Sequence, residues 1–407
     1  MHTMSRRSII GTAAVTAVLP CRPARAQQAT IRIGVLNDQS GPYRDDGGPT
    51  GAICVRQAVQ EFGDKGFNVE VLVADHQNKP DIGAGVARRW FDWDGVDAIV
   101  DVPTSSVALA VSTVCREKNK VLLNSGAATT DLTGTQCSPN TVHWTYDTYM
   151  LARSTGGAMV KAGGDTWFFI TADYVFGQQL QRDTTAFVTA AGGKVLGSRL
   201  YPFPDTTDFS SLLVQAQSSG AKVLGLCNSG YDTLNCIKQA AEFGVNKQMK
   251  IAAMLMYNSN VHALGLETAQ GLLMTEAFYW DLNDRTRAWM DRIKSKTPNQ
   301  WPNMVQAGDY ASVVHYLKAV TDLGASAAKA DGGAVVARMK AMPTDDDCFG
   351  KGMIRADGRH IHPSYLFQAK SPAESKGGWD GLKLVETTPA AEAFRPIAQG
   401  GCPLIRS

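Results

Sequence analysis

Alternation of apolar, strand-like runs with amphipathic helical stretches is the feature that most limits how this chain can fold. The first cycle joins the apolar run 31–36 to a helix over 52–62 through a loop rich in Asn, Asp, Gly and Pro. Further apolar runs follow at 69–74, 97–102 and 121–123. The pattern predicts an α/β fold with mostly parallel sheets and helices on both faces. The loop after the first run is then expected at the sheet edge where such folds bind ligands.

The alternation restarts near Asp147 and so predicts a second domain of the same type. Its expected strands are 166–171, 195–201, 223–227, 250–255 and 272–277. A chain of 407 residues is long enough for two domains. Beyond residue 284 helical stretches dominate before short strand-like pieces at 352–355 and 364–369. This change suggests a return to the first domain and an end on the second, although periodicity alone does not prove that route.

The first 26 residues have the character of an export signal. Arg6 and Arg7 precede an apolar run over 9–19, and Ala24-Arg25-Ala26 forms a small-x-small cleavage site. Residues 5–10 resemble a twin-arginine leader, with the general secretory route left open. A run of about 11 apolar residues is too short to cross a bilayer. The sequence therefore predicts a periplasmic protein cleaved near Ala26.

The charge balance gives no sign of a nucleic-acid partner. The leader contains four arginines and no acidic residue, so its removal leaves 36 basic and 38 acidic side chains, a formal charge of −2. Proteins that bind nucleic acids usually concentrate positive charge on one surface. We expect no such partner here.

Seven cysteines remain after cleavage, and an odd number leaves at least one without a partner in the same chain. Disulfides persist in an oxidising compartment. Two pairs are candidates: Cys115 with Cys137, which one expected strand separates, and Cys348 with Cys402 in the loop-rich tail. The other three, Cys54, Cys227 and Cys236, lie in apolar stretches and are expected to be core thiols.

The glycines at 47, 48 and 51, followed by Asp75, loosely resemble a dinucleotide-binding fingerprint. That fingerprint needs its glycines directly at the end of the strand, so that the backbone can approach the pyrophosphate. Here about ten residues intervene, and neither a P-loop nor a GxSxG nucleophile motif occurs in the sequence. We therefore expect no nucleotide cofactor.

Two groups of titratable residues could be taken for metal ligands. Asp357, His360 and His362 flank a predicted turn, and the acids at 345–347 are consecutive, without the spacing of a calcium loop. Solvated loop charge is the better interpretation of both groups, so we expect neither a metal nor another cofactor.

Polar loops after two neighbouring strands of the first domain form a more informative pattern. Residues 103–106 open a helix with hydroxyl groups and free backbone N–H groups, a setting that favours an anion. Residues 124–130 follow the next strand with similar small, hydroxylic side chains. Each loop alone could be an ordinary helix cap. Together they form a candidate carboxylate pocket.

The corresponding loops of the second domain carry aromatic side chains instead. They cover residues 173–177, 228–232 and 254–258 and include Tyr174, Phe176 and Tyr257. Aromatic side chains offer a large apolar contact with a polar tip. A cleft between the two domains is the natural place for them.

The leader, the segment IRIGVLNDQSGPY at 31–43 and DYVFGQQL at 173–180 resemble the type I periplasmic substrate-binding proteins of branched-chain amino-acid ABC transporters. The likeness extends over nearly all of the mature chain. It implies two doubly wound α/β lobes that close on a ligand and are joined by a three-segment hinge. The implied lobes are residues 30–146 plus 278–342, and residues 147–277 plus 343–407.

Carried over by position, the resemblance places the ligand carboxylate near Ser105, Ala127 and Thr129. Tyr43 then covers one side of the ligand, with Phe176 and Asn228 on the other lobe. With their neighbours, the expected ligand-contacting residues are Tyr43, Ser105, Ser106, Ser125, Ala127, Thr129, Tyr174, Phe176, Asn228, Asp232 and Tyr257.

One departure from the family affects the expected ligand. Amino-acid binders of this family carry an acidic residue just after the fourth strand of the second domain, where this chain has residues 256–258, Met-Tyr-Asn, and no acid before Glu267. Asp232 could substitute for it but lies at a predicted helix start, where capping is its expected role. Burying an ammonium group in the pocket without a partner would weaken the binding free energy by several kcal/mol. An aromatic or hydrophobic acid is therefore favoured, with a branched-chain amino acid next.

The resemblance implies a monomeric receptor that delivers a small solute to an inner-membrane ABC permease. No nucleophile and base pair or metal set emerges from the sequence, so we expect no catalysis. Two alternatives remain open, a ligand-sensing domain of similar fold and a secreted α/β enzyme.

Overall fold

Two separate sheets form the framework of the protein, which the computed structural model describes over residues 28–405. The first sheet has the strand order β2-β1-β3-β4-β5, and every pairing in it is parallel. Its strands are β1 (Thr30–Asn37), β2 (Asn68–Asp75), β3 (Ala98–Asp101), β4 (Val121–Asn124) and β5 (Thr141–His143). The central strands β3 and β4 are buried along their whole length, as expected for strands covered on both faces.

The second sheet has the order β15-β14-β10-β9-β8-β6-β7. Strands β6 to β10 pair in parallel, whereas β14 and β15 are added antiparallel at one edge. The strands are β6 (Thr166–Ala172), β7 (Lys194–Tyr201), β8 (Val223–Cys227), β9 (Lys250–Ala253), β10 (Leu273–Glu276), β14 (Ser364–Ala369) and β15 (Leu382–Thr388). The restart of the alternation predicted this second sheet.

Helices cover both faces of the first sheet. One face packs on α1 (Gly48–Phe62) and α12 (Met304–Leu323), and the other on α2 (Pro80–Arg89) and α3 (Ser105–Glu117). Asn303 caps the start of α12, and its side chain accepts hydrogen bonds from the N–H groups of Val305 and Gln306. The remaining helices on this side are α11 (Asp284–Ile293), α13 (Ala325–Ala330) and α14 (Gly332–Ala341).

The second sheet is covered in the same way. The helices are α4 (Thr148–Leu151), α5 (Gly157–Lys161), α6 (Val175–Ala190), α7 (Ser210–Ser218), α8 (Gly230–Glu242), α9 (Asn258–Leu264) and α10 (Leu266–Ala269). Short helical turns are η1 (Trp90–Asp94), η2 (Thr130–Thr133), η3 (Ala152–Gly156), η4 (Val245–Lys247) and η5 (Ile397–Gln399), and α15 (Ala390–Ala393) follows β15. Among the helices of residues 28–405, none is both long and apolar enough to cross a membrane.

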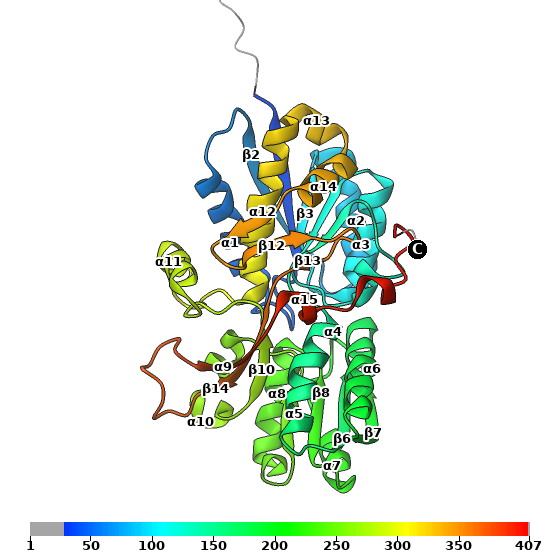
Figure 1. Ribbon diagram of the computed structural model, residues 1–407, viewed down its shortest axis with the longest axis vertical. Helices are drawn as coiled ribbons and strands as arrows, with labels where there is room; N and C mark the ends of the chain where they lie inside the picture. Colours follow the sequence, from blue (N-terminus) through cyan, green and yellow to red (C-terminus); the bar gives the residue numbers. More distant parts are fainter. Residues whose placement is uncertain (1–27, 406–407) are drawn as a thin grey trace, which may run out of the picture.

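Each sheet with its helices forms one lobe, and the lobes lie one above the other (Figure 1). We call them the first lobe and the second lobe after their sheets. The chain passes between them after β5, after β10 and between β13 (His360–Ile361) and β14. This arrangement confirms the predicted α/β fold of two doubly wound lobes joined by a three-segment hinge.

A small third sheet lies beside the first lobe. It contains β11 (Thr344–Asp346), β12 (Gly350–Ile354) and β13, and a bridge between His143 and Arg359 joins its end to β5. The resemblance assigned residues 343–407 to the second lobe. Of these, β14 and β15 lie in the second sheet, whereas 344–361 lie against the first lobe. We propose the division at residues 362–363, where the chain leaves the small sheet.

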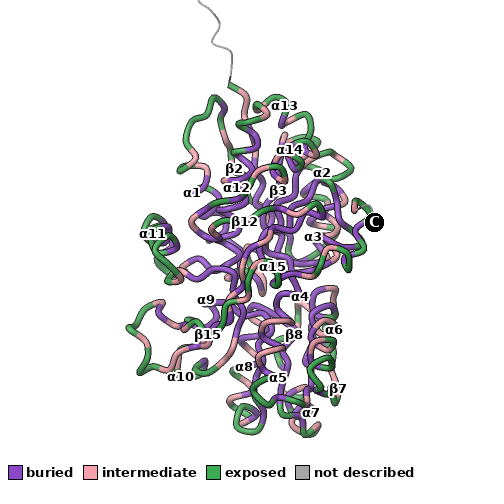
Figure 2. The backbone as a smooth tube through the Cα atoms, in the orientation of Figure 1, coloured by how far each residue is buried: buried purple, intermediate pink, exposed green. Residues whose placement is uncertain are grey.

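The largest apolar cluster runs through both lobes without interruption. It joins Val35 and Trp144 of the first lobe to Trp167 and Phe169 of the second. In Figure 2 the buried backbone likewise continues from one lobe into the other through the hinge. The structure is therefore that of a closed form, in which the two lobes share one core.

The disulfide connectivity differs from the predicted pairs. Cys137 is bonded to Cys402, 265 residues away in sequence, so the pairs Cys115 with Cys137 and Cys348 with Cys402 are wrong. The tail turns back to the first lobe after β15 and brings Cys402 to the loop that follows η2. Cys115 and Cys348 are buried and unpaired within residues 28–405. The expected core thiols Cys54, Cys227 and Cys236 are confirmed as buried and free.

The predicted leader, 1–26, lies outside the described residues.

The interpretation of Asp357, His360 and His362 as solvated loop charge is wrong, because all three are buried at the hinge. Asp357 accepts two hydrogen bonds from the Arg355 guanidinium, and His360 stacks on Trp144 with ring centroids 4.1 Å apart. Of the acids at 345–347, the middle one, Asp346, is also buried. These polar groups are part of the packing that holds the small sheet on the first lobe.

Candidate functional site

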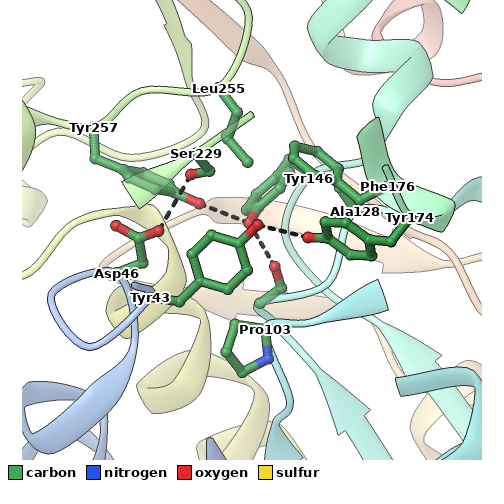
Figure 3. Close-up of a pocket in the computed structure, with 11 residues that line it drawn as sticks. Tyr43, Asp46, Pro103, Ala128, Tyr146, Tyr174, Phe176, Ser229, Leu255 and Tyr257 are labelled. Carbon is green, nitrogen blue, oxygen red and sulfur yellow. Dashed lines mark hydrogen bonds between the residues drawn. The ribbon is translucent and has the colours of Figure 1, made fainter. Parts of the chain in front are cut away.

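A small cavity lies between the lobes, at the carboxyl ends of the parallel strands of both sheets. Loops of the first lobe and the first hinge segment contribute Tyr43, Asp46, Pro103, Gly126, Ala128 and Tyr146. Loops of the second lobe contribute Tyr174, Phe176, Ser229, Leu255 and Tyr257. Figure 3 shows these side chains converging from both lobes. The walls are mainly aromatic, with few polar groups, as in most small-molecule sites.

Two tyrosine pairs close the cavity. The hydroxyl of Tyr43 lies 2.6 Å from that of Tyr174, and the hydroxyls of Tyr146 and Tyr257 lie 2.7 Å apart (Figure 3). Tyr146 donates to the carbonyl oxygen of Gly126 at 2.5 Å, so Tyr257 is the donor in the second pair. Burial raises the pKa of all four phenols. They therefore remain protonated and act as neutral hydrogen-bonding groups.

The loop after β1 is held in shape by Asp38. Its carboxylate accepts hydrogen bonds from the backbone N–H groups of Gly41 at 2.6 Å and Tyr43 at 2.8 Å. Asn78 donates a further bond to it at 2.7 Å. An aspartate that bonds to the backbone a few residues on is a common way to build a tight turn. The turn fixes the ring of Tyr43 in the cleft.

A main-chain hydrogen bond joins the lobes next to the cavity. The N–H of Tyr231 donates to the carbonyl oxygen of Pro42 at 3.1 Å. Gly230, with φ of 60°, allows this approach, because a Cβ at that position would lie 2.2 Å from the Pro42 oxygen. Glycine is the residue that adopts positive φ without penalty. The close contact at Pro42 therefore depends on a glycine at position 230.

Asp46 is the acidic group of the cavity. One carboxylate oxygen, Oδ2, accepts a hydrogen bond from Ser229 Oγ at 3.2 Å, and the other, Oδ1, is buried and finds no hydrogen-bond partner among residues 28–405. Burial raises the pKa of Asp46 well above its ordinary value. A buried carboxyl with an unused oxygen can accept a hydrogen bond from a ligand or pair with its positive charge.

Phe203 packs on the tyrosine pair at the edge of the cavity. Its ring stacks on Tyr174 with centroids 4.6 Å apart and on Tyr43 with centroids 5.1 Å apart. Tyr43 belongs to the first lobe and the other two to the second. The three rings thus form an aromatic contact between the lobes.

A second pair of acids lies behind the wall of the first lobe. Asp101, at the end of β3, accepts a hydrogen bond from Asn37 Nδ2 at 2.8 Å, and Asp309 of α12 accepts one from Ser125 Oγ. A Cβ on Gly51 would lie within 3.2 Å of an oxygen of each acid, so the two carboxyls are close neighbours. Burial raises the pKa of Asp101 to about 7 and that of Asp309 well above its ordinary value.

Four of the predicted ligand-contacting residues line the cavity: Tyr43, Tyr174, Phe176 and Tyr257. The others lie around it. Ser105 is buried at the start of α3, and Ser106 beside it is half-buried. Ser125 donates to Asp309, and the N–H of Ala127 donates to the Asn124 side chain. Thr129 donates to Gln179 of the second lobe. Asn228 accepts from Thr233, and Asp232 accepts from Tyr201.

Several lining residues are not among the predicted ligand contacts. Ala128 and Ser229 lie one position from predicted residues, and Asp46 lies three positions after Tyr43 in the same loop. Their position at the carboxyl ends of strands was the available signal. Tyr146 lies on the first hinge segment, and no local pattern marks such a residue. Within the part of the chain that the structure describes, no group of three or more His, Cys, Asp and Glu residues could hold a metal ion.

Comparisons with known proteins agree with this architecture. The family model described as "Periplasmic binding protein" matches residues 30–378. A crystal structure of a periplasmic binding protein from Burkholderia mallei shares 47% identity with a TM-score of 0.89, covering 93% of this chain and 99% of that one. A branched-chain amino-acid ABC transporter periplasmic ligand-binding protein from Burkholderia xenovorans shares 34% identity with a TM-score of 0.79, covering 92% and 99%. A solute-binding protein from R. palustris in complex with benzoate shares the fold at 20% identity, with a TM-score of 0.78 and coverage of 89% and 97%.

Proposed function

The chain belongs to the periplasmic binding protein family, as the resemblance implied, and from this premise we propose that it is the extracytoplasmic receptor of an ABC importer. In this role it captures a small solute between its lobes and delivers it to a permease in the inner membrane. The relative from Burkholderia xenovorans, at 34% identity, supports the link to an ABC transporter. The leader-like first 26 residues support export to the periplasm.

The observation that carries this proposal is the cavity itself, because its walls come from both lobes. A ligand that touches Tyr43 of the first lobe and Tyr174 of the second stabilises the closed form over an open one. Ligand binding would thus be read out as lobe closure, which is the signal that a permease can recognise.

We propose that the ligand is a small carboxylic acid with an aromatic or hydrophobic body. The rings of Tyr43, Tyr146, Tyr174, Phe176 and Tyr257 offer flat or edge contacts to an aromatic ring. The solute-binding protein from R. palustris has the same fold and was crystallised with benzoate, so a protein of this fold can bind an aromatic acid.

The start of α3 is our proposed place for the ligand carboxylate. Pro103 lines the cavity just before this helix, and Ser105 Oγ is buried without a hydrogen-bond partner among the described residues. The first N–H groups of a helix have no partner within it, and the helix dipole favours negative charge there.

Asp46 refines the proposed ligand. The lack of an acid just after the fourth strand of the second domain favours an aromatic acid, but Asp46 brings an acid to the cavity from the opposite lobe. An aromatic acid with a hydroxyl group would satisfy its free oxygen by a neutral hydrogen bond. An amino acid would instead require Asp46 to ionise, against the burial that raises its pKa. A hydroxylated aromatic acid therefore stands first and a branched-chain amino acid second.

A thermal-shift screen tests the proposal, because a ligand that binds only the folded protein raises its melting temperature by mass action. The panel contains benzoate, 4-hydroxybenzoate, phenylalanine, leucine and benzamide. Stabilisation by the two benzoates and not by benzamide supports a carboxylate ligand. Tight leucine binding, measured by calorimetry, would reverse the order of the two ligand classes. Stabilisation by benzamide alone would contradict a carboxylate ligand altogether.

A further inference from the structure

The C-terminal tail, residues 389–405, runs from the second lobe back to the first. It leaves the second sheet at the end of β15, passes through α15 at the hinge and ends beside the first lobe (Figure 1). The three hinge segments already described lie earlier in the chain. Within residues 28–405 the tail is thus a further link between the lobes, and its contacts can be followed from one lobe to the other.

The tail is held at the second lobe and at the hinge. Glu392 pairs with Arg153 of η3 at 2.6 Å. Phe394 is buried, and the Arg359 guanidinium lies 4.2 Å from the centre of its ring. Arg359 in turn donates hydrogen bonds to the carbonyl oxygens of Thr145 and Tyr146 in the first hinge segment. The tail therefore packs on the same group that holds the hinge.

At the first lobe the tail contacts the loop that forms the cavity wall. Arg395 Nη2 donates to the carbonyl oxygen of Thr130 at 3.1 Å. The contact is close, because a Cβ on Gly134 would lie 2.7 Å from Arg395 Nη2 and 2.9 Å from the carbonyl oxygen of Gly400. Seven residues beyond Arg395, Cys402 forms the disulfide with Cys137. These contacts lie at the start of η2 and just after its end. The helical turn η2 itself begins two residues after the lining residue Ala128.

We propose that the C-terminal tail is a fourth connection between the lobes, and that Arg395 and Cys402 are positioning residues for the cavity wall at 126–130. The disulfide fastens the tail to the first lobe, and Phe394 and Glu392 fasten it to the hinge and the second lobe. Opening the lobes then requires the tail to stretch or detach. The inference rests on the proposed function only in treating the cavity as the ligand site.

A tail that merely covers the surface is the simpler alternative. It would give local stability around Cys137 but would not restrain the lobes or reach residues 126–130. The two ideas thus differ in lobe opening and in the dynamics of the cavity wall. Both properties can be measured on ligand-free protein, so the result does not depend on the ligand being known.

The main test replaces both cysteines in the variant Cys137→Ser/Cys402→Ser. Hydrogen exchange by mass spectrometry reports the wall, and small-angle X-ray scattering reports lobe opening. We expect exchange over 126–137 to accelerate by roughly tenfold or more and the radius of gyration to increase. Unchanged exchange at 126–130 would overturn the positioning role, and an unchanged radius of gyration would overturn the fourth connection.

Two further variants keep the test decisive. Arg395→Ala leaves the disulfide intact and should accelerate exchange at 126–130, so it decides the positioning role if the double variant does not fold. Cys115→Ser is the matched control, because it changes a buried, unpaired cysteine of the first lobe that lies in α3. It should leave both readouts as in the unmodified protein. An equal effect in this control would assign the changes to loss of a buried sulfur and overturn the proposal.

Discussion

The hydroxyl groups of Tyr43 and Tyr174 meet at 2.6 Å although the two residues belong to different lobes and lie 131 positions apart. Each ring also stacks on Phe203, so the pair is both hydrogen-bonded and packed. This contact joins the loop after β1 to the start of α6 directly over the cavity. The two lobes are therefore joined beside the cavity by both a hydrogen bond and stacked rings.

Removing the Tyr43 hydroxyl should weaken ligand binding. In Tyr43→Phe the ring still stacks on Phe203 and only the hydrogen bond is lost, so we expect affinity to fall about fivefold to tenfold. Tyr43→Ala also removes the ring, so we expect it to lower the affinity about a hundredfold. Calorimetry with the acid identified by the thermal-shift screen measures both values. Tyr365→Phe, on β14 outside the cavity, is the control and should bind as the unmodified protein does.

An alanine at position 230 should oppose lobe closure. Its Cβ would lie 2.2 Å from the Pro42 carbonyl oxygen, so the main-chain bond between Tyr231 and Pro42 could not form in the present geometry. We expect the affinity of Gly230→Ala to fall at least about tenfold.

Gly220→Ala is the matched control for this change. Gly220 also has positive φ, 69°, but a Cβ there meets no atom of the described residues within 4 Å. Both alanines carry the backbone penalty of roughly 1 kcal/mol for a left-handed residue, and only one carries the clash. Equal affinities for the two variants would show that the contact at Pro42 does not contribute to closure.

The role of Asp46 can be read from an isosteric change. In Asp46→Asn the side chain still accepts a hydrogen bond but cannot balance a positive charge. For a hydroxylated aromatic acid we expect a change of less than about threefold, and for an amino acid a loss of about tenfold or more. Calorimetry of the variant with 4-hydroxybenzoate and leucine separates the two cases. A large loss for 4-hydroxybenzoate would contradict the neutral hydrogen bond that we propose.

The acid pair Asp101 and Asp309 should make stability depend on pH. Burial raises the pKa of Asp101 to about 7 and that of Asp309 also upward, so the folded protein holds protons that the unfolded chain releases near its ordinary, lower pKa. Their contribution is complete at low pH and is lost as pH rises through the folded pKa.

Asp309→Asn tests this dependence, because it removes one ionisable group and retains an acceptor for Ser125. Between about pH 5 and pH 8 we expect the variant to lose about 1–2 kcal/mol less stability than the unmodified protein, since one pKa unit corresponds to roughly 1.4 kcal/mol. Urea unfolding at several pH values gives the comparison. Parallel pH profiles would contradict the coupling of the two acids.

Local patterns were sufficient to predict the two sheets, because strands such as β1 and β6 are short apolar runs bounded by turn residues. The same patterns pointed to Tyr174 and Tyr257, since each lies within four residues of the end of a strand, β6 and β9 respectively. Tyr146 and Asp46 could not be selected in this way. Their role depends on how the lobes close, and no periodicity in either segment encodes that approach.

The cysteine pairing failed for a similar reason. Cys348 lies between β11 and β12 and is buried in the apolar core, whereas the tail brings Cys402 to Cys137 in the loop after η2. His360 flanks a predicted turn, which favours solvated loop charge, yet it lies in β13 of the small sheet, is buried, and stacks on Trp144. In both cases the environment of the residue depends on packing between segments far apart in the sequence, which local sequence patterns do not indicate.

The hydrogen bond from the Tyr231 N–H to the Pro42 carbonyl involves no side-chain atom. Closure can therefore keep this contact whatever residues line the cavity. If Pro42 and Gly230 are left unchanged, we expect substitutions at Phe176 or Leu255 to change the preferred solute while this contact between the lobes is preserved. In such a scaffold, side chains of the cavity determine the solute, whereas a main-chain contact joins the lobes when they close. This separation makes the chain a suitable starting point for an engineered biosensor.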